Sequence, residues 1–435
     1  MWSESVFIGE QLSISGITAK ELAKVFGTPT FFIDEVDFRA RALAWERALT
    51  DAFGANAGTV YYAAKAFICT EVARWIQDCG IGIDVCTGGE LAVALAGGIE
   101  PEKIELHGNN KSETEIEKAV QAGVGIIVLD SLFEIERVAA AAAKAGKVQK
   151  VLLRLTPGIQ SHTHQSIATA HEDVKFGFSI ASGAAWSAIS AVRSQVSLEL
   201  RGLHAHIGSQ IFGFAAFELC AQRLIELLAK YRDEFNFELP ELDLGGGYAI
   251  AYLPGEEQVN PAAAMQKLAT AVAKNCALHN LQIPKISVEP GRAIVGPTMF
   301  TLYEVGTVKD VLLENGVHRR YISIDGGMSD NIRPSLYGAE YTTVLANRVS
   351  QAAKVSSRLV GKHCETGDIV IREIDLPADI VPGDLLAVPA TGAYGRSMAS
   401  NYNHVPKPPV VAVKAGKSRV IVRRETVADL LALDI

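Results

Sequence analysis

Between residues 59 and 288, short apolar runs alternate with longer segments rich in Ala, Glu and Lys, and this alternation constrains the fold most strongly. Continuously apolar strands separated by helices indicate a parallel sheet that is buried on both faces. Eight such units over roughly 230 residues have the size of a (β/α)8 TIM barrel. A doubly wound open sheet is the alternative, but no GxGxxG fingerprint follows an early run. The eight runs are Thr59–Ala63, Gly82–Cys86, Lys103–His107, Gly125–Leu129, Lys150–Leu155, Leu200–Ile207, Glu241–Leu244 and Lys285–Val288.

The carboxyl ends of these runs carry polar and glycine residues. In a barrel all such positions surround one mouth, which is where barrel enzymes place their chemistry. The convergence therefore predicts an enzyme. The positions are Lys65, Asp84, Thr87–Glu90, His107–Asn110, Asp130, Ser131, Arg154, His204, His206, Ser209, Gly245–Gly247 and Glu289–Arg292.

A second domain is expected because helical periodicity fades after about residue 295 and short β-rich runs follow. Turn signals such as Asp325-Gly326-Gly327 divide these runs. An early strand around Phe31 is expected to complete this all-β domain. We therefore predict a barrel domain over residues 35–295 and a β-rich domain over residues 1–34 and 296–435. The expected strands are Met299–Val308, Arg320–Ile324, Tyr341–Val344, Asp368–Ile371, Leu385–Pro389, Val410–Val413 and Arg419–Val422.

The net charge and the cysteines limit which partners the chain is expected to bind and in which compartment it is expected to lie. The chain of 435 residues has a net charge of −8 and no long basic run, which argues against nucleic acid as a partner. It has no uninterrupted apolar stretch long enough for a transmembrane helix, and residues 1–10 lack a signal-peptide pattern. The six cysteines include no CxxC pair, which is typical of a reduced protein in the cytoplasm.

Lys65 ends the first run, after the β-branched and aromatic residues 59–62 and two alanines. A lysine beside an apolar wall loses hydration, its pKa falls, and its amine becomes a usable nucleophile for a Schiff base. A lysine that extends from a strand end to solvent is the simpler interpretation of this stretch alone.

Glycines and a carboxylate follow the last two runs. Gly245–Gly247 lies where barrels commonly hold phosphate, and Arg292 could add charge, although a tight turn without a ligand gives the same pattern. Glu289 needs a cationic or protonated partner if it is buried. A protonated pyridine nitrogen and an arginine such as Arg154 both meet that need.

His204 and His206 alternate along one strand, so both side chains point to the same face. Neighbouring residues do not complete a zinc site, and no metal is expected. For His206 a flat imidazole that stacks on an aromatic ring is the functional interpretation. For His204 we favour a hydrogen-bonded core histidine.

Three motifs of the β-rich domain carry reactive or recognition groups. Cys364 lies between polar residues before a Thr-Gly turn, and such a thiol can act as an acid or remain an inert loop cysteine. Arg333, Tyr337 and Tyr394 put guanidinium and phenol groups in loops, where the arginine fork suits a carboxylate.

Taken together, these motifs resemble the fold-type III pyridoxal-phosphate decarboxylases, and over nearly the whole chain the diaminopimelate decarboxylase family. The most specific motifs are His-x-His-Ile-Gly-Ser at 204–209 and Glu-Pro-Gly-Arg at 289–292. Cys-Glu-Thr-Gly-Asp at 364–368 points to the diaminopimelate branch, because ornithine and related decarboxylases carry an aspartate after the cysteine. Phe67, Cys86 and Thr87 depart from the expected Asn, Val and Ser without removing a catalytic group.

The resemblance implies decarboxylation of meso-2,6-diaminopimelate to L-lysine and carbon dioxide, the last step of lysine biosynthesis, with pyridoxal 5'-phosphate as cofactor. It implies that Lys65 forms the Schiff base with the cofactor and that Cys364 protonates the carbanion. The implied cofactor-binding residues are Lys65, Asp84, His206, Ser209, Gly246, Gly247, Glu289, Pro290, Gly291, Arg292 and Tyr394. The implied substrate-binding residues are Arg292, Arg333, Tyr337, Glu365 and Tyr394.

The family is a homodimer with active sites at the interface, which implies that Cys364 and Glu365 serve the partner's Lys65. Another decarboxylase or a racemase of the same fold stays an alternative, although racemases place a tyrosine base where this chain has Cys364. A catalytically inactive homologue that binds an active partner would have lost Lys65 or Cys364. Whether the polar loop Gln160–His171 closes over the substrate is left open.

Overall fold

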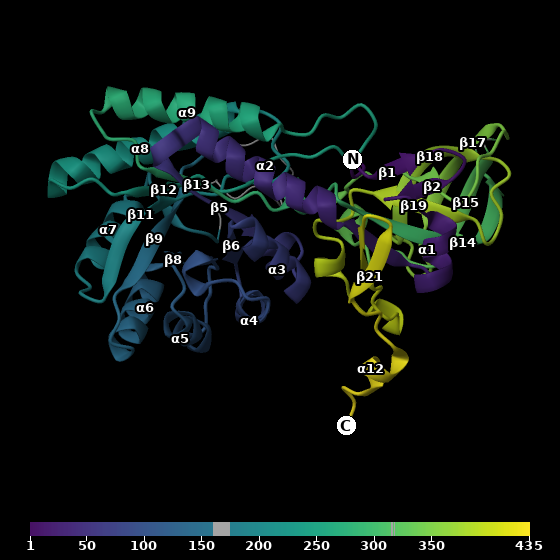
Figure 1. Cartoon of the computed structure of the whole chain (residues 1–435), viewed down its shortest axis with the longest axis horizontal. Helices are drawn as coiled ribbons and strands as arrows, with labels where there is room; N and C mark the ends of the chain where they lie inside the picture. Colours follow the sequence, from purple (N-terminus) through teal and green to yellow (C-terminus); the bar gives the residue numbers. More distant parts are fainter. Residues whose placement is uncertain (160–174, 315, 317) are drawn as a thin grey trace. The chain divides into compact units, whose positions relative to one another are not determined.

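The computed structural model describes residues 1–159, 175–314, 316 and 318–435, which form two compact units (Figure 1). The barrel unit comprises Arg41–Ala249 and Val259–Ala293, and the β-rich unit comprises Met1–Ala40, Ile250–Gln258 and Ile294–Ile435. The loop for which closure over the substrate was considered, Gln160–His171, lies outside the described residues.

The barrel unit contains a closed ring of eight parallel strands, which confirms the predicted fold class. Neighbouring strands pair in the order β5-β6-β7-β8-β9-β11-β12-β13, and β13 pairs back with β5. All residues of β6, β7 and β8 are buried, as expected for strands covered on both faces. The strands are β5 (Ala57–Ala63), β6 (Gly82–Val85), β7 (Ile104–Leu106), β8 (Ile126–Leu129), β9 (Gln149–Thr156), β11 (Leu198–His204), β12 (Glu241–Asp243) and β13 (Lys285–Val288), and the short β10 (Phe178–Ser179) pairs with β9.

Helices between the strands surround this ring (Figure 1). Three of them begin at a side-chain cap, in which Thr87, Ser112 or Ser131 accepts a hydrogen bond from the backbone N–H of a glutamate three residues later. Each cap fixes the path from a strand end into the next helix, and this positions the polar residues of the mouth. The helices are α3 (Thr70–Cys79), α4 (Gly88–Ala96), α5 (Glu113–Ala122), α6 (Leu132–Lys144), α7 (Ala184–Arg193), α8 (Ala215–Phe235) and α9 (Pro261–Leu278).

The β-rich unit is built around β14, which pairs with β4, β15 and β19. The early strand β4 therefore belongs to this sheet, as its sequence predicts. Phe32 and Phe300 lie opposite one another on β4 and β14 with ring centroids 5.4 Å apart, in a cluster with Leu302 and Val411. The strands are β4 (Thr30–Asp34), β14 (Met299–Leu312), β15 (His318–Ile324), β16 (Val344–Leu345), β17 (Lys354–Val360), β18 (Ile369–Pro377), β19 (Leu385–Pro389), β20 (Val410–Lys414) and β21 (Lys417–Val422).

In this unit one predicted strand was wrong, and β17 was not predicted. Tyr341–Val344 is mostly irregular, and only Val344 belongs to β16. The strand β17 was missed, because its centre, Ser356–Arg358, is polar and interrupts the apolar run used to recognise strands. The remaining elements are β1 (Val6–Ile8), β2 (Leu12–Ile14), β3 (Ile17–Thr18), α1 (Ala19–Phe26), α2 (Glu35–Phe53), α10 (Arg292–Val295), α11 (Arg333–Tyr337) and α12 (Val427–Leu431).

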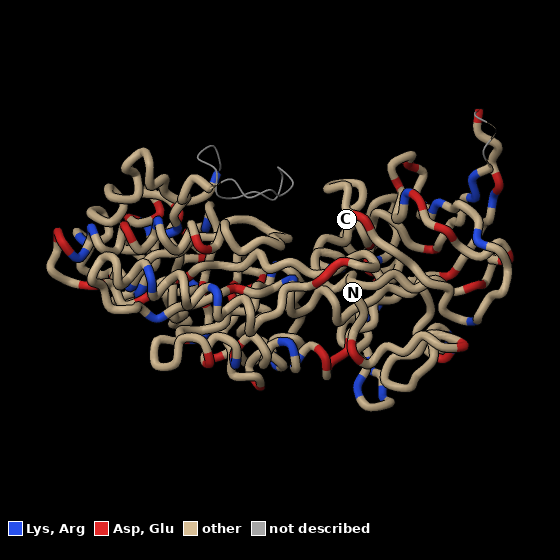
Figure 2. Tube along the Cα trace, turned by 90° about the horizontal axis from the view of Figure 1, so that it is seen from above, with Lys and Arg blue, Asp and Glu red and all other residues tan. Residues whose placement is uncertain are grey.

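Basic and acidic residues are interspersed along the trace in both units (Figure 2). Among the described residues, no helix combines the length and the apolar character that crossing a bilayer requires.

Candidate active site

Lys65 lies in a single turn, Ala64–Ala66, that directly follows β5. Its side chain is about one-third exposed, and its Nζ lies 3.7 Å from Oδ2 of the fully buried Asp84 on β6. A Cβ added at Gly291 would lie 2.8 Å from the Cβ of Ala63, so the segment after β13 approaches the end of β5 closely. The structure thus brings the predicted amine, Asp84 and Gly291 together at the carboxyl ends of adjacent strands.

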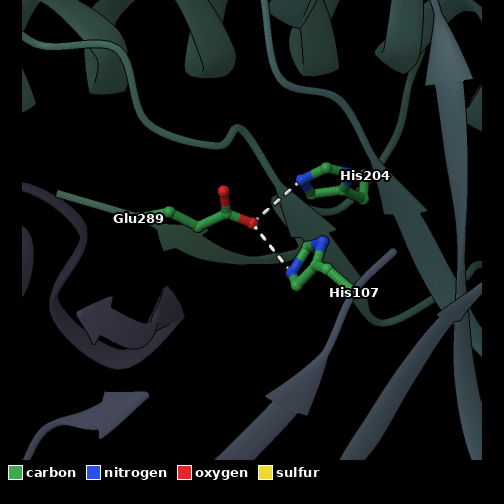
Figure 3. A group of neighbouring side chains, drawn as sticks. All are labelled: His107, His204 and Glu289. Carbon is green, nitrogen blue, oxygen red and sulfur yellow. Dashed lines mark ion pairs between the residues drawn. The ribbon is translucent and has the colours of Figure 1, made fainter. Parts of the chain in front are cut away.

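Glu289 follows β13 and is 3% exposed. Its Oε1 lies 2.9 Å from Nε2 of His204 and 3.2 Å from Nε2 of His107 (Figure 3). Burial alone would raise the pKa of Glu289, but its contacts with His204 and His107 outweigh burial, so this pKa lies well below its usual value. Glu289 is therefore a buried, ionised carboxylate.

The two histidines differ in charge. Burial would lower the pKa of His107, but the carboxylates of Asp84 and Glu289 outweigh it and hold the pKa well above the usual value. Burial lowers the pKa of His204 to about 4, in spite of the attraction of Glu289. At neutral pH His107 is therefore a cation and His204 is neutral.

His206 supplies a neutral ring. Its Nδ1 accepts a hydrogen bond of 3.2 Å from the backbone N–H of Gly246, which fixes the plane of the imidazole. Burial and then the charge of Lys65 hold the pKa of His206 well below the usual value. A neutral, oriented imidazole beside Glu289 is suited to lie against a flat aromatic ring.

The glycines after β11, β12 and β13 form a cradle that a side chain would fill. A Cβ at Gly246 would lie 2.2 Å from the carbonyl oxygen of Glu289, and one at Gly247 would lie 2.5 Å from that of Gly208. Gly247 also has φ of +110°, which L residues rarely adopt. Beside this cradle Arg292 donates a hydrogen bond of 2.9 Å to Oγ of Ser209, so a cationic donor and a hydroxyl are held together.

In the β-rich unit the predicted arginine is buried and held. Arg333 donates a hydrogen bond to the phenol of Tyr341, and its guanidinium lies 4.7 Å from the ring centroid of Tyr252. Tyr337 ends the short helix α11 and is half-buried. Tyr394 is half-buried, with φ of +60°, in the loop after β19.

Cys364 and Glu365 are exposed on a turn before β18. The backbone N–H of Cys364 donates to Oδ1 of Asn403 over 3.3 Å, and Oε1 of Glu365 accepts from the N–H of Gly367 over 3.2 Å. The turn has a fixed backbone while it presents a thiol and a carboxylate outward.

His107 is the residue whose role the sequence did not reveal. It was recognised only as one polar residue at a strand end, and its proximity to Glu289 depends on closure of the barrel. The one local signal is Glu105 two residues earlier, whose side chain points to the same side of β7. His204, favoured as a core histidine, is buried as expected but also contacts Glu289.

The barrel and its site define a class of protein, and comparison with known proteins identifies it. Residues 35–296 match the family model for the pyridoxal-binding domain of pyridoxal-dependent decarboxylases. The chain is 56% identical to diaminopimelate decarboxylase of Mycobacterium tuberculosis over 97% of this chain and 94% of that protein. It is 42% identical to the Bacillus subtilis enzyme of the same name over 98% and 95%.

Among solved structures, diaminopimelate decarboxylase from M. jannaschii in complex with L-lysine superposes with a TM-score of 0.90. That match has 29% identity and covers 100% of this chain and 99% of the other. This chain therefore belongs to the diaminopimelate decarboxylase family of pyridoxal-phosphate-dependent enzymes.

The residues of the barrel unit fit pyridoxal phosphate. Oδ2 of Asp84 is a buried oxygen without a hydrogen bond of good geometry among the described residues, which is a costly state for a carboxylate. A protonated ring bound beside Asp84 and Glu289 would add positive charge, and the glycine cradle with Arg292 would accept a phosphate. Lys65 and His206 supply the amine and the flat neighbour.

Proposed function

We propose that this chain acts as a homodimer that decarboxylates meso-2,6-diaminopimelate to L-lysine and carbon dioxide, with active-site residues drawn from both subunits. The observation that carries the proposal is the buried Glu289, which two histidines hold ionised beside a lysine amine and a glycine cradle. Such a carboxylate is suited to keep a pyridine nitrogen protonated. Pyridoxal phosphate, when bound, supplies the electron sink for the carbanion left by departing carbon dioxide.

The barrel residues bind and orient. Lys65 provides the amine that attaches the cofactor, and Glu289 holds a proton on the ring nitrogen. His206 lies against the ring, and Asp84 balances the charge of Lys65. The phosphate is held by Ser209, Gly247 and the backbone of Gly291 and Arg292, with Tyr394 nearby. The cofactor site also includes Gly246 and Pro290.

The predicted β-rich domain, over residues 1–34 and 296–435, provides recognition and the proton. Arg333 and Tyr337, with Arg292 and Tyr394, bind substrate carboxylate. Glu365 binds the ammonium of the distal centre that does not react. Recognition of a second amino-acid centre by charged groups disfavours lysine, because lysine lacks the distal carboxylate and would leave the carboxylate-binding groups unpaired.

Cys364 protonates the carbon from which carbon dioxide leaves. Cys364 and Glu365 are exposed within their own unit, and this exposure supports a role in the active site of a second copy. We therefore assign them to the partner's Lys65 in a homodimer that works in the cytoplasm.

The test is to add pyridoxal phosphate and meso-diaminopimelate to purified protein while lysine release and the visible absorption are followed. We expect a visible band that depends on Lys65, together with stoichiometric lysine and carbon dioxide. A band without lysine would retain the cofactor but contradict the substrate. In that case the same assay with ornithine, lysine and alanine would identify the alternative.

A further inference from the structure

His107 directly follows β7 and contacts the buried carboxylate of Glu289. Its backbone N–H donates to the carbonyl oxygen of Val85 over 2.8 Å, so the residue is tied to the neighbouring strand β6. Its side chain is 4% exposed. Its Nε2 faces three carboxylates, at 3.2 Å from Glu289, 3.7 Å from Glu105 and 3.9 Å from Asp84.

Three buried carboxylates around one imidazole nitrogen favour the protonated ring. A neutral imidazole would either turn a lone pair toward these oxygens or leave them without a cation, and both states are costly in a low dielectric. Burial raises the pKa of Glu105 to about 7, so Asp84 and Glu289 supply most of the negative charge beside His107 at neutral pH. His204 lies with its ring centroid 4.8 Å from that of His107, and repulsion disfavours a second imidazolium there.

The contacts distinguish the two oxygens of Glu289. Oε1 meets both His107 and His204, as the dashed lines in Figure 3 show. Oε2 lies on the other side, 3.7 Å from Nδ1 of His206. That nitrogen already accepts a hydrogen bond from Gly246, so it does not donate to Oε2. Oε2 is therefore the oxygen of Glu289 on the side of His206, where the cofactor ring would lie.

We propose that His107 is a positioning residue for the decarboxylation: as an imidazolium it holds Oε1 of Glu289, so that Oε2 faces the ring nitrogen of the cofactor. His204 contacts the same oxygen as a neutral ring and restricts the rotation of the carboxylate. His107 thus acts through Glu289 and does not touch the reacting atoms. This inference rests on the proposed function, since it explains how that site keeps its cofactor protonated.

A divalent metal ion is the other group that could join His107, His204 and Glu289, which lie close enough together to share one. A metal ligand must be a neutral imidazole with its lone pair on the ion. The carboxylates of Asp84 and Glu105 beside His107 favour the opposite state, because they stabilise its proton. We therefore assign a proton, not a metal, to this cluster.

The first test compares His107→Gln with the matched variant His204→Gln, because both side chains contact the same oxygen but only His107 carries charge. We expect His107→Gln to lower kcat by about 30-fold or more, as when one partner of a buried charge pair is lost, with little change in KM. The acid limb of the kcat profile moves to higher pH, since Glu289 loses the cation that keeps it ionised. His204→Gln should lower kcat less and leave that limb in place.

The titratable and charged groups near His107 that this profile involves are Lys65, Asp84, Glu90, Glu105, Arg154, His204, Asp243 and Glu289. A loss of kcat without movement of the acid limb would show a merely structural role and overturn the proposal. Equal effects of the two variants would overturn it as well. His318→Gln on the exposed start of β15 is the control for replacing a histidine.

A second measurement is independent of turnover. In protein labelled with nitrogen-15 histidine, the resonances lost in His107→Gln identify His107, and they should report a doubly protonated ring at pH 8. The same ring should become neutral at that pH in Glu289→Gln, which tests the contact if His107→Gln does not fold. A neutral His107 in the wild type overturns the proposal.

The dissociation constant of pyridoxal phosphate, measured by titrating the cofactor-free chain, should rise more in His107→Gln than in His204→Gln. The proposal would also be overturned if the protein contained a stoichiometric metal ion and if removing that ion with a chelator abolished cofactor binding. The cluster would then hold a metal ion in place of the proton. If wild-type protein binds pyridoxal phosphate but releases no lysine, the proposed substrate fails. The nitrogen-15 and binding measurements then still decide the role of His107.

Discussion

The two units present their functional groups in opposite ways. In the barrel unit Glu289, His107 and His204 are at most 3% exposed and are in contact with one another. In the β-rich unit Cys364 and Glu365 are exposed, and only their backbone and a short turn contact are fixed. The charged groups of the barrel site therefore pair within one unit, whereas the β-rich unit presents a thiol and a carboxylate outward.

The turn that carries Cys364 and Glu365 is exposed, but hydrogen bonds hold it in place. The buried Asp368 accepts hydrogen bonds from the backbone N–H groups of Met328, over 2.7 Å, and His363, over 2.9 Å. The ring of His363 contacts Oγ of Ser329 over 2.8 Å. The turn that carries Cys364 is therefore held in place, which suits the proposed role of this thiol as a proton donor to one face of a carbanion.

Lys65→Ala should give the largest effect, and it tests whether the barrel unit supplies the amine that attaches the cofactor. We expect activity to fall by more than about 10³-fold, because the amine that attaches the cofactor is lost and no other group replaces it. The visible band of the loaded enzyme should also disappear. Lys144→Ala on the exposed face of α6 is the matched control and should keep both activity and band. A normal band in Lys65→Ala would contradict the role of this lysine.

The barrel was predictable because strands that are buried on both faces consist of continuous apolar runs, and such runs can be recognised in the sequence. Lys65 and Glu289 were recognised for the same reason, since each directly follows such a run. The strand β17 was not predicted, because its centre is polar and its pairing depends on the distant strands β15 and β18. The contact of His107 with Glu289 joins β7 to the end of β13, and no local pattern records which strand ends meet across a closed barrel.

Lys111→Met tests whether buried charge in the barrel also stabilises the fold. Lys111 is buried, and its Nζ donates three hydrogen bonds of 2.7 Å to Gly108 O, Val128 O and Oε1 of Glu134. Methionine keeps the volume but leaves the Glu134 carboxylate buried without its cation. We expect the free energy of unfolding to fall by about 3–5 kcal/mol. Denaturant titration measures it.

The matched change Lys144→Met removes the exposed pair with Glu117 and should leave the unfolding midpoint unchanged. Equal midpoints for the Lys111 and Lys144 variants would remove the distinction between buried and exposed charge on which the comparison rests.

Cys364→Ala tests the β-rich side. We expect kcat to fall by about 10²-fold, as when a general acid is removed, while pyridoxal phosphate still binds and the visible band remains. Cys276→Ala, which removes a buried thiol of α9, is the control for loss of a cysteine.

Mixing Cys364→Ala with Lys65→Ala then tests whether sites are shared. In a symmetric dimer half of the molecules become mixed, and each of these has one complete site, so roughly a quarter of wild-type activity should return. If no activity returns although subunits exchange, Cys364 serves the Lys65 of its own chain, and the contrast between a complete and a partner-dependent unit fails.

Glu35 gives the smallest effect and tests whether a buried ion pair stabilises the β-rich unit. Its side chain is 4% exposed and lies 2.8 Å from Nζ of Lys414 and 2.7 Å from Arg419. Burial opposes ionisation, but these two cations outweigh it and lower the pKa of Glu35. A lowered carboxyl pKa stabilises the fold above the unfolded-state value of about 4.3, and this stabilisation is lost as the pH falls through the folded-state value.

We therefore expect Glu35→Gln to cost about 1 kcal/mol at pH 7, with a difference from wild type that shrinks below about pH 4. Unfolding curves of both proteins across this range measure it, with Glu117→Gln as the exposed control. A difference that does not depend on pH would mean that Glu35 acts through packing or helix capping. Buried ion pairs would then stabilise the barrel unit, whereas this part of the β-rich unit would be stabilised by apolar packing.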